Sequence, residues 1–322
     1  MKTAVVAIGG NAILPRGSAG GAADQRRRVR ATCRVLADLI ADGYDIALTH
    51  GNGPQVGDAL LRHEAAKRLA PPLPLDVCVA ETQAQIGYLL QQELRNELGR
   101  RGLKRNVTSL VTQVLVDPRD PAFRNPSKPV GPYYTKTAAT ELRRRKHWKM
   151  VHDPRGGWRR VVPSPRPLEI IETATIRRLL FTGTTDEVVI VGGGGGIPVV
   201  RRGGRLIGVE AVVDKDLAAS VLATGIGEKL FLILTDVPHV SLGFGTPRAR
   251  RLPRVTASEL QRHFDAGEFP PGTMGPKVEA ALGFLANGGE RAVITNLPSL
   301  RAALAGKAGT TIVRGDTSGQ RS

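Results

Sequence analysis

The hydrophobic positions of this chain follow two periodicities, one typical of buried strands and one typical of amphipathic helices. Thr3–Ile8 is a short apolar run with β-branched residues that ends at glycines, which predicts a buried strand. Arg26–Asp42 instead carries apolar residues every three or four positions and stops at Gly43, which predicts a helix. The next apolar run, Tyr44–Thr49, predicts a second strand.

The remainder of the chain repeats this alternation. We expect further strands at 107–115, 186–191, 230–235, 291–295 and 310–313. We expect further helices after residue 55, at 84–98, 169–180 and 277–286, and from about residue 214. Alternating strands and helices, with several continuous apolar strands, predict an α/β fold with a mainly parallel sheet covered on both faces.

One segment, residues 118–167, fits neither periodicity. It holds nine of the 22 prolines, and it carries 13 lysines and arginines against three acidic residues. We therefore expect it to form a separate excursion from the sheet, and we place a weak lobe boundary near 183–186.

Composition narrows the setting of the protein. At 322 residues and 41% hydrophobic content the chain can bury a full core, and no apolar run reaches the roughly 18 residues that span a bilayer. The apolar run after Lys2 is too short for a signal peptide. The two cysteines, Cys33 and Cys78, show neither metal-binding spacing nor a disulfide framework, so we expect a reducing cytoplasm.

The formal net charge of +17 favours an anionic partner, such as nucleic acid, a membrane surface or a phosphorylated small molecule. The run Arg143–Lys146 could contact nucleic acid. Aromatic residues make up only 4% of the chain and no recognition motif is present, so we interpret this run as a solvated face.

Two lysines stand at predicted helix starts. Asp214 is a preferred N-cap residue, which puts Lys215 in the first turn of a helix, and Pro276 suits a first helical position and does the same for Lys277. A cation is disfavoured at the positive end of a helix dipole unless an anion offsets it. The pair therefore indicates a phosphate-binding site, to which Lys128, fixed between two prolines, can be added.

Three glycine clusters follow predicted strands, at 9–10, 51–53 and 192–196. In open α/β sheets ligands bind beyond the carboxyl ends of strands, where glycine lets backbone N–H groups approach an anion. The last cluster is followed by Ile197 and Pro198 and so fails the dinucleotide fingerprint, and no P-loop sequence occurs. A bound nucleotide would be held in another way.

Other catalytic chemistries find little support. His50 follows a strand, but we interpret it as a structural histidine rather than an acid or base. No histidine or cysteine has the spacing along the chain that is typical of zinc sites, so no metal ligands are assigned. No G-x-S-x-G sequence is present, which argues against an α/β-hydrolase.

The set of short motifs resembles the carbamate kinase family, within the amino-acid-kinase fold. The resemblance runs from about residue 3 to 313 and rests on motifs that occur in order: Gly9-Gly-Asn-Ala12, Thr49-His-Gly-Asn-Gly-Pro-Gln-Val-Gly57, Pro74-Leu-Asp-Val-Cys78, Gln85-Ile-Gly-Tyr88, Asn125-Pro-Ser-Lys-Pro129, 157–167, Gly194-Gly-Gly-Ile-Pro-Val-Val200, Asp214-Lys-Asp-Leu-Ala218 and Met274-Gly-Pro-Lys-Val-Glu-Ala280. Each motif alone is modest, and the ordered set is specific.

The resemblance implies a three-layer αβα sandwich over 1–313, usually a homodimer, with a tail at 314–322. It implies an acceptor lobe at 1–185, a protruding subdomain that corresponds to 118–167, and a nucleotide-binding lobe at 186–313. The implied reaction is reversible phosphoryl transfer between ATP and carbamate, giving ADP and carbamoyl phosphate with Mg²⁺, often run toward ATP in arginine fermentation. Carbamate is already an anionic oxygen nucleophile, so no general base is required.

The resemblance also implies roles for individual residues. The carbamate and the transferred phosphoryl group would be held by Gly9, Gly10, Asn11, Gly51, Asn52 and Gly53. Lys215 and Lys277 would neutralise the nucleotide phosphates, with Asp214 orienting the lysine and Lys128 reaching in from the subdomain. The nucleotide would contact Gly194, Gly195, Thr235, Asp236, Val237 and Met274. The chain departs from the family pattern at Pro238 and Ser241, where an aspartate and a tyrosine are common.

Two alternatives stay open from the sequence. One is an enzyme of the same fold with a different acceptor, such as an N-acetylglutamate or uridylate kinase, which the 125–129 motif and the inserted subdomain disfavour. The other is a polyanion-binding protein that uses the +17 charge. The role of Asp216, either in the helix dipole or in an indirect magnesium contact, is also open.

Overall fold

The computed structural model describes residues 2–14, 21–153, 156–181 and 187–315. Its centre is a mixed sheet in the order β15-β17-β16-β12-β1-β2-β9-β3, in which every neighbouring pair is parallel except β16 and β17. The strands span Lys2–Ile8 (β1), Tyr44–His50 (β2), Asn106–Ser109 (β3), Glu187–Ile190 (β9), Leu230–Thr235 (β12), Arg254–Thr256 (β15), Arg291–Asn296 (β16) and Thr310–Val313 (β17). The predicted parallel α/β sheet is confirmed.

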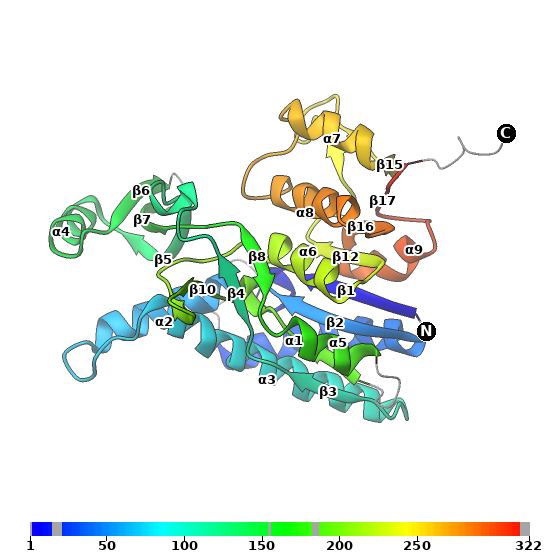
Figure 1. Cartoon of the computed structure of the whole chain (residues 1–322), viewed down its shortest axis with the longest axis horizontal. Helices are drawn as coiled ribbons and strands as arrows, with labels where there is room; N and C mark the ends of the chain where they lie inside the picture. The colour runs from blue at the N-terminus through cyan, green and yellow to red at the C-terminus, as the bar shows by residue number, and fades with distance from the viewer. Residues whose placement is uncertain (1, 15–20, 154–155, 182–186, 316–322) are drawn as a thin grey trace.

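Helices cover both faces of this sheet, as Figure 1 shows for α1 and α3 on one side and α6 and α8 on the other. The helices span Ala22–Ala41 (α1), Gly53–Ala66 (α2), Leu75–Arg100 (α3), Lys136–Lys146 (α4), Thr173–Phe181 (α5), Lys215–Ile226 (α6), Ala257–Asp265 (α7), Gly275–Ala286 (α8) and Leu300–Leu304 (α9). Along β1, Val5 and Ala7 pack on the α6–α8 side, and Val6 and Ile8 pack on the α1–α3 side. Burial of alternate residues on opposite faces explains why β1 reads as a continuous apolar run.

Two predicted elements are only partly right. The stretch 107–115 forms two strands, because β3 pairs with β9 in the main sheet whereas β4 (Gln113–Val116) pairs with β10 (Ile197–Arg202) and β8 (Pro167–Ile170) in a second sheet. The predicted helix at 169–180 begins as strand β8, and α5 starts only at Thr173. Tertiary pairing with β4 outweighs the local helical pattern there.

The segment 118–167 forms its own three-stranded sheet in the order β5-β7-β6, with α4 beside it. Its strands are Lys128–Tyr134 (β5), Lys149–Asp153 (β6) and Gly157–Val162 (β7). It projects from the main sheet beside α2 (Figure 1). It therefore forms a structural excursion of its own.

The predicted lobe boundary at 185/186 falls in residues 182–186, which lie outside the described part of the chain, as do tail residues 316–322. Strand β9, which that division places in the C-terminal lobe, lies between β2 and β3. Smaller elements complete the fold: β11 (Arg205–Gly208), β13 (Ser241–Leu242), β14 (Arg250–Arg251) and the 3₁₀ turns at Gly10–Ala12, Pro121–Phe123, Gly193–Gly195 and Leu297–Ser299. Among the described residues, no helix combines the length and apolar character needed to cross a bilayer.

Candidate active site

The first part of the site is the start of α6. Asp214 caps this helix, since its Oδ1 accepts a hydrogen bond from the backbone N–H of Asp216 at 2.9 Å. This confirms the predicted N-cap and places Lys215 in the first turn. The Lys215 side chain is 13% exposed, so its ammonium lies largely out of water at the positive end of a helix dipole.

A second helix start lies beside the first. Helix α8 begins at Gly275 with Pro276 in its first turn, as predicted, and it packs along α6. The carboxylate of Asp216 lies between the two helices, with Oδ1 2.5 Å from Lys215 Nζ and Oδ2 2.9 Å from Lys277 Nζ. Asp216 is 3% exposed, so this bridge is buried. The side chain of Asp216 therefore lies between the two lysines.

The subdomain supplies a third lysine. Lys128, at the start of β5, donates to Asp214 Oδ2 at 2.9 Å. Asp214 was expected to orient Lys215, but its ion pair is with Lys128, and Asp216 is the carboxylate that contacts Lys215. Three lysines and two aspartates thus alternate across the site and leave one net positive charge before any ligand binds.

The charges in this cluster are strongly coupled. Burial lowers the pKa of Lys215, the Asp216 carboxylate opposes this shift, and the nearby Lys277 ammonium adds to it. Burial also opposes ionisation of Asp216, but Lys215 and Lys277 outweigh it and hold the pKa of that carboxyl at about 2. Asp216 is therefore the anion that keeps two ammonium groups close together.

Glycine loops form the opposite wall. The loops that follow β1, β2 and β9 lie at the carboxyl ends of neighbouring parallel strands. A Cβ on Gly51 would lie 3.1 Å from the Gly10 nitrogen and 3.4 Å from Lys215 Cδ, so two of the loops contact each other and the lysine. A Cβ on Gly194, whose φ is +68°, would lie 2.1 Å from Asn52 Nδ2, so the third loop contacts the second.

These features enclose one cavity of about 870 Å³. It is lined by most of the residues predicted from the sequence: Gly9, Gly10, Gly51, Asn52, Gly53, Lys128, Gly194, Asp214, Lys215, Thr235, Asp236, Val237, Met274 and Lys277. Gly195 does not line it and packs against the Val213 backbone, where a Cβ would lie 2.5 Å from the carbonyl oxygen. The backbone of Asn11 lies in the 3₁₀ turn after β1, and its side chain is outside the described structure.

Some lining residues were not predicted from the sequence. They lie in the segments after β12 and before α8, with Ser241 in the short strand β13: His239, Ser241, Phe244, Phe269 and Thr273. The departure at Pro238 and Ser241 was the only sequence signal for them. Phe244 and Phe269 place aromatic surface in the cavity, which Ser241 also lines.

His50 lies behind the site rather than in it. The residue is 1% exposed, and a Cβ on Gly193 would come within 2.5 Å of its ring. Burial lowers the pKa of His50 to about 4, with a smaller contribution from the charge of Lys215. A neutral, enclosed imidazole agrees with the structural role expected from the sequence.

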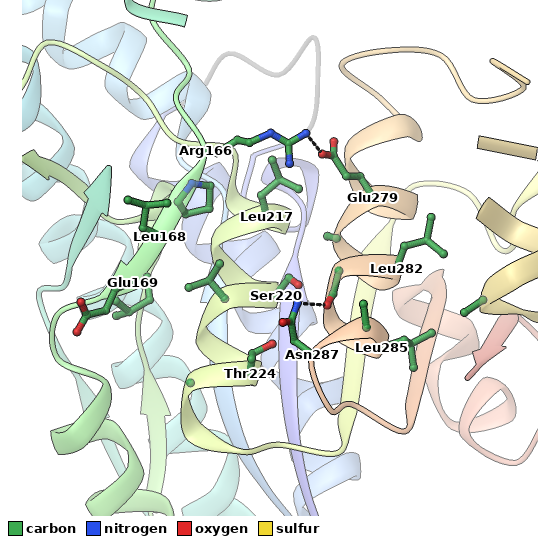
Figure 2. A pocket seen from close by; sticks show the side chains of 18 of the residues that line it. Arg166, Leu168, Glu169, Leu217, Ser220, Thr224, Glu279, Leu282, Leu285 and Asn287 are labelled. Carbon is green, nitrogen blue, oxygen red and sulfur yellow. Dashed lines mark hydrogen bonds and ion pairs between the residues drawn. The ribbon is translucent and has the colours of Figure 1, made fainter. Parts of the chain in front are cut away.

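A second hollow, of about 990 Å³, runs along α6 between β8 and α8 (Figure 2). Apolar side chains such as Leu168, Leu217 and Leu282 form much of its wall, and an ion pair between Arg166 and Glu279 lies at one end. No lysine is found among the described residues that line it. It is lined by Arg166 and Arg314 instead, whereas the lysines at the two helix starts line the first cavity.

Comparisons with known proteins agree with this geometry. The sequence pattern of the amino acid kinase family matches residues 2–296. The chain is 49% identical over 317 residues to the carbamate kinase of Thermococcus kodakarensis, covering 98% of this chain and 100% of that protein. It is also 46% identical to the carbamate kinase-like protein YahI of Escherichia coli, with 96% of this chain and 98% of that protein covered. The carbamate kinase of Giardia lamblia bound to AMP-PNP superimposes with a TM-score of 0.92 at 41% identity, over 98% of this chain and 99% of that one. The chain therefore belongs to the amino acid kinase family, and its full-length similarity is to the carbamate kinases.

Proposed function

We propose that this chain catalyses reversible phosphoryl transfer between ATP and carbamate, the carbamate kinase reaction. The observation that carries the proposal is the pair of lysines at adjacent helix starts, held by one buried aspartate and faced by glycine loops. A transferring phosphoryl group spreads negative charge over its oxygens, and fixed cations and backbone N–H groups stabilise that charge. Full-length similarity to carbamate kinases supports carbamate as the acceptor.

The mechanism needs positioning and charge neutralisation rather than proton abstraction. Carbamate attacks through an oxygen that is already anionic, so the reaction requires no general base. The proposal agrees with the position of His50, which is enclosed and does not line the cavity. Lys215 and Lys277 neutralise the phosphates, and their burial makes each charge worth more than it would be in water.

Binding roles follow from the walls of the cavity. The glycine loops after β1 and β2 bind the carbamate and the transferred phosphoryl group through backbone N–H groups. The nucleotide lies along residues 235–237 and Met274, with Phe244 and Phe269 offering apolar contact to the base. Lys128 leaves Asp214 or shares it when an anionic ligand arrives, because phosphate oxygens compete for the same ammonium.

Magnesium belongs to the proposal as a companion of the nucleotide. Two carboxylates of the cavity, Asp214 and Asp216, each accept hydrogen bonds from lysines. This donor set fits a water-mediated contact better than direct ligation, and Mg²⁺ ordinarily keeps several waters and binds through substrate phosphates. When bound, Mg²⁺ supplies charge neutralisation of the phosphate oxygens.

The decisive experiment is a coupled assay of ATP formation from ADP and carbamoyl phosphate with Mg²⁺. We expect ATP to form with carbamoyl phosphate as phosphoryl donor. In the reverse direction we expect phosphorylation of carbamate and not of N-acetylglutamate or UMP. Absence of ATP formation by folded protein would sink the proposal, and activity with another acceptor alone would move the chain to a different branch of the family.

The homodimer implied by the resemblance is a separate expectation. Light scattering after size-exclusion chromatography measures it directly, with about twice the 34.4 kDa chain mass as the predicted result. A mass of one chain at assay concentration would contradict it.

A further inference from the structure

Helices α2 and α3 bring together three side chains that the amino-acid sequence separates. His63 lies near the end of α2, and Cys78 and Glu81 lie three residues apart near the start of α3, which puts them on one face of that helix. One imidazole nitrogen, the thiol sulfur and one carboxylate oxygen all lie within 4.8 Å of one another. Spacing along the chain predicted no such cluster, because its members come from two helices.

The distances approach those of a tetrahedral metal site. His63 Nε2 and Glu81 Oε2 are 3.3 Å apart. Ligand bonds of about 2.0–2.3 Å in a tetrahedron place neighbouring donor atoms roughly 3.3–3.6 Å apart. His63 and Glu81 are 23% and 44% exposed, so small rotations of these two side chains can bring them to the sulfur without moving either helix.

The surroundings of Cys78 favour a cation. The residue is 0% exposed, and its thiol donates to the Leu73 carbonyl at 3.8 Å, a weak contact that a metal can replace. The carboxylates of Glu81, Glu210 and Asp76 add negative charge around the thiol. The carboxylates that oppose a bare thiolate attract a divalent ion to the same place.

We propose that His63, Cys78 and Glu81 form a binding site for a borderline-soft divalent ion of the zinc type. A donor set of imidazole nitrogen, thiolate and one carboxylate selects such ions over Mg²⁺, which prefers oxygen alone. Three protein ligands leave a fourth position for water on the exposed Glu81 side. This site is distinct from the lysine–glycine cavity and does not rest on the proposed function.

The ion would join the two ends of the connection between α2 and α3. His63 precedes this connection, residues 67–74, and Cys78 follows it, so coordination closes a short loop and restricts the unfolded chain. Helix α2 starts at Gly53 of the active-site loop, and the Asn52 side chain donates to Thr82, the residue after Glu81. Metal binding should therefore stabilise the whole protein as well as the pair of helices α2 and α3.

The test uses full-length protein treated with a chelator and titrated with Co²⁺, whose spectrum reports both sulfur ligation and tetrahedral geometry. We expect a near-ultraviolet sulfur-to-metal charge-transfer band that saturates at one equivalent, and competition by Zn²⁺ that removes it. Cys33→Ser is the matched control, because Cys33 is also 0% exposed and makes the same 3.8 Å contact with a backbone carbonyl. The band should persist in that variant and vanish in Cys78→Ser.

Two further variants keep the test independent of how Cys78→Ser folds. His63→Gln and Glu81→Gln change partly exposed side chains, and each should weaken metal affinity at least about tenfold. Even mutation of a residue that only hydrogen-bonds to a metal ligand commonly costs that much affinity. Zn²⁺ should raise the melting temperature of the wild type and of Cys33→Ser, and not that of His63→Gln. No charge-transfer band in the wild type, or unchanged affinity in both glutamine variants, would overturn the site.

Discussion

The residues of the active site owe their positions to alternating charge. Lys128 pairs with Asp214, and Asp216 separates Lys215 from Lys277. Two buried ammonium groups repel each other strongly at this range unless an anion lies between them. Asp216 is that anion in the structure, and in the proposed reaction the nucleotide phosphates share this role.

Replacing Asp216 with asparagine tests this arrangement. Asp216→Asn leaves two buried lysines without their shared carboxylate, and we expect a loss of about 3 kcal/mol in the free energy of unfolding. Because phosphate can take the place of the lost anion, ADP or inorganic phosphate should raise the melting temperature more in the variant than in the wild type. Asp24→Asn, which removes a surface ion pair with Arg27, serves as the control and should lose less than about 1 kcal/mol. Equal ligand-induced shifts in variant and wild type would refute the bridging role.

Lys215→Ala tests the charge itself. Loss of one preorganised electrostatic group should lower turnover in the coupled assay by about 10²-fold or more. Lys229→Ala is the control, because this lysine is 60% exposed and donates to the Gly288 carbonyl outside the cavity. A decrease of less than threefold for Lys215→Ala would remove that lysine from the mechanism.

His50 predicts part of the acid sensitivity of the fold. Its folded pKa of about 4 lies below the ordinary 6.5, so the unfolded chain binds more protons between these values. Stability from this residue is therefore present above about pH 6.5 and lost as the pH falls toward 4, by about 3 kcal/mol in total. Urea unfolding at pH 7 and pH 4.5 should show a smaller difference for His50→Gln than for the wild type. The exposed His152→Gln should keep the wild-type slope, and an unchanged slope in His50→Gln would contradict the assignment.

For single residues, the sequence predicted most of those that line the cavity but few of the ion pairs between them. Lys215, Lys277 and the glycines were recognisable because helix starts and strand ends leave local signals. The ion pair between Lys128 and Asp214 was not predicted, because it joins the subdomain to α6 across 86 positions of the chain. The cluster of His63, Cys78 and Glu81 was not predicted either, because its residues come from two helices.

Among the elements, strands and helices with a single strong periodicity were predicted well. Strand β12 and strand β17 have the predicted bounds, and α8 begins two residues before its predicted start. Helix α3 begins at Leu75 rather than at 84. Its first turns bury Leu75, Cys78 and Val79, an apolar spacing of i, i+3 and i+4 that the prediction did not use. The division of 107–115 between two sheets depends on strand partners, which a local pattern does not contain.

The glycine loop after β9 gives an element-scale prediction. Gly194→Ala introduces a Cβ at φ +68° and drives it into the Asn52 side chain, so both stability and ATP formation should fall. Gly203→Ala is the matched control, since Gly203 has φ +53° in the turn between β10 and β11 and open space around it. It should lose only the roughly 1 kcal/mol of left-handed strain and keep its activity. Equal losses in the two variants would show that contact with Asn52 is unimportant.

For the whole molecule, the basic subdomain raises the question of nucleic-acid binding. Several of its cations are engaged within the chain: Arg143 stacks on Trp158, Arg145 pairs with Glu141, and Lys146 contacts Glu64 and Trp148. These contacts favour a structural role for the run Arg143–Lys146 over a role in binding polyanions.

We therefore expect no saturable binding of duplex DNA or RNA in fluorescence anisotropy at about 0.15 M salt, where surface charges are screened beyond about 8 Å. Arg144→Ala combined with Arg145→Ala should leave ATP formation unchanged. Tight binding that disappears in this double variant would revive the polyanion hypothesis.

The position of β1 in the middle of the main sheet sets the order of events during synthesis. Strand β1 leaves the ribosome long before β12 (Leu230–Thr235), and it pairs with β2 on one side and with β12 on the other. At about 5–20 residues per second, its second partner emerges roughly 10–45 s after it. Throughout this interval the nascent chain carries an unpaired apolar strand edge, a template for wrong pairing. Stalled or truncated chains that end before residue 230 should therefore depend on chaperones far more than the completed protein does.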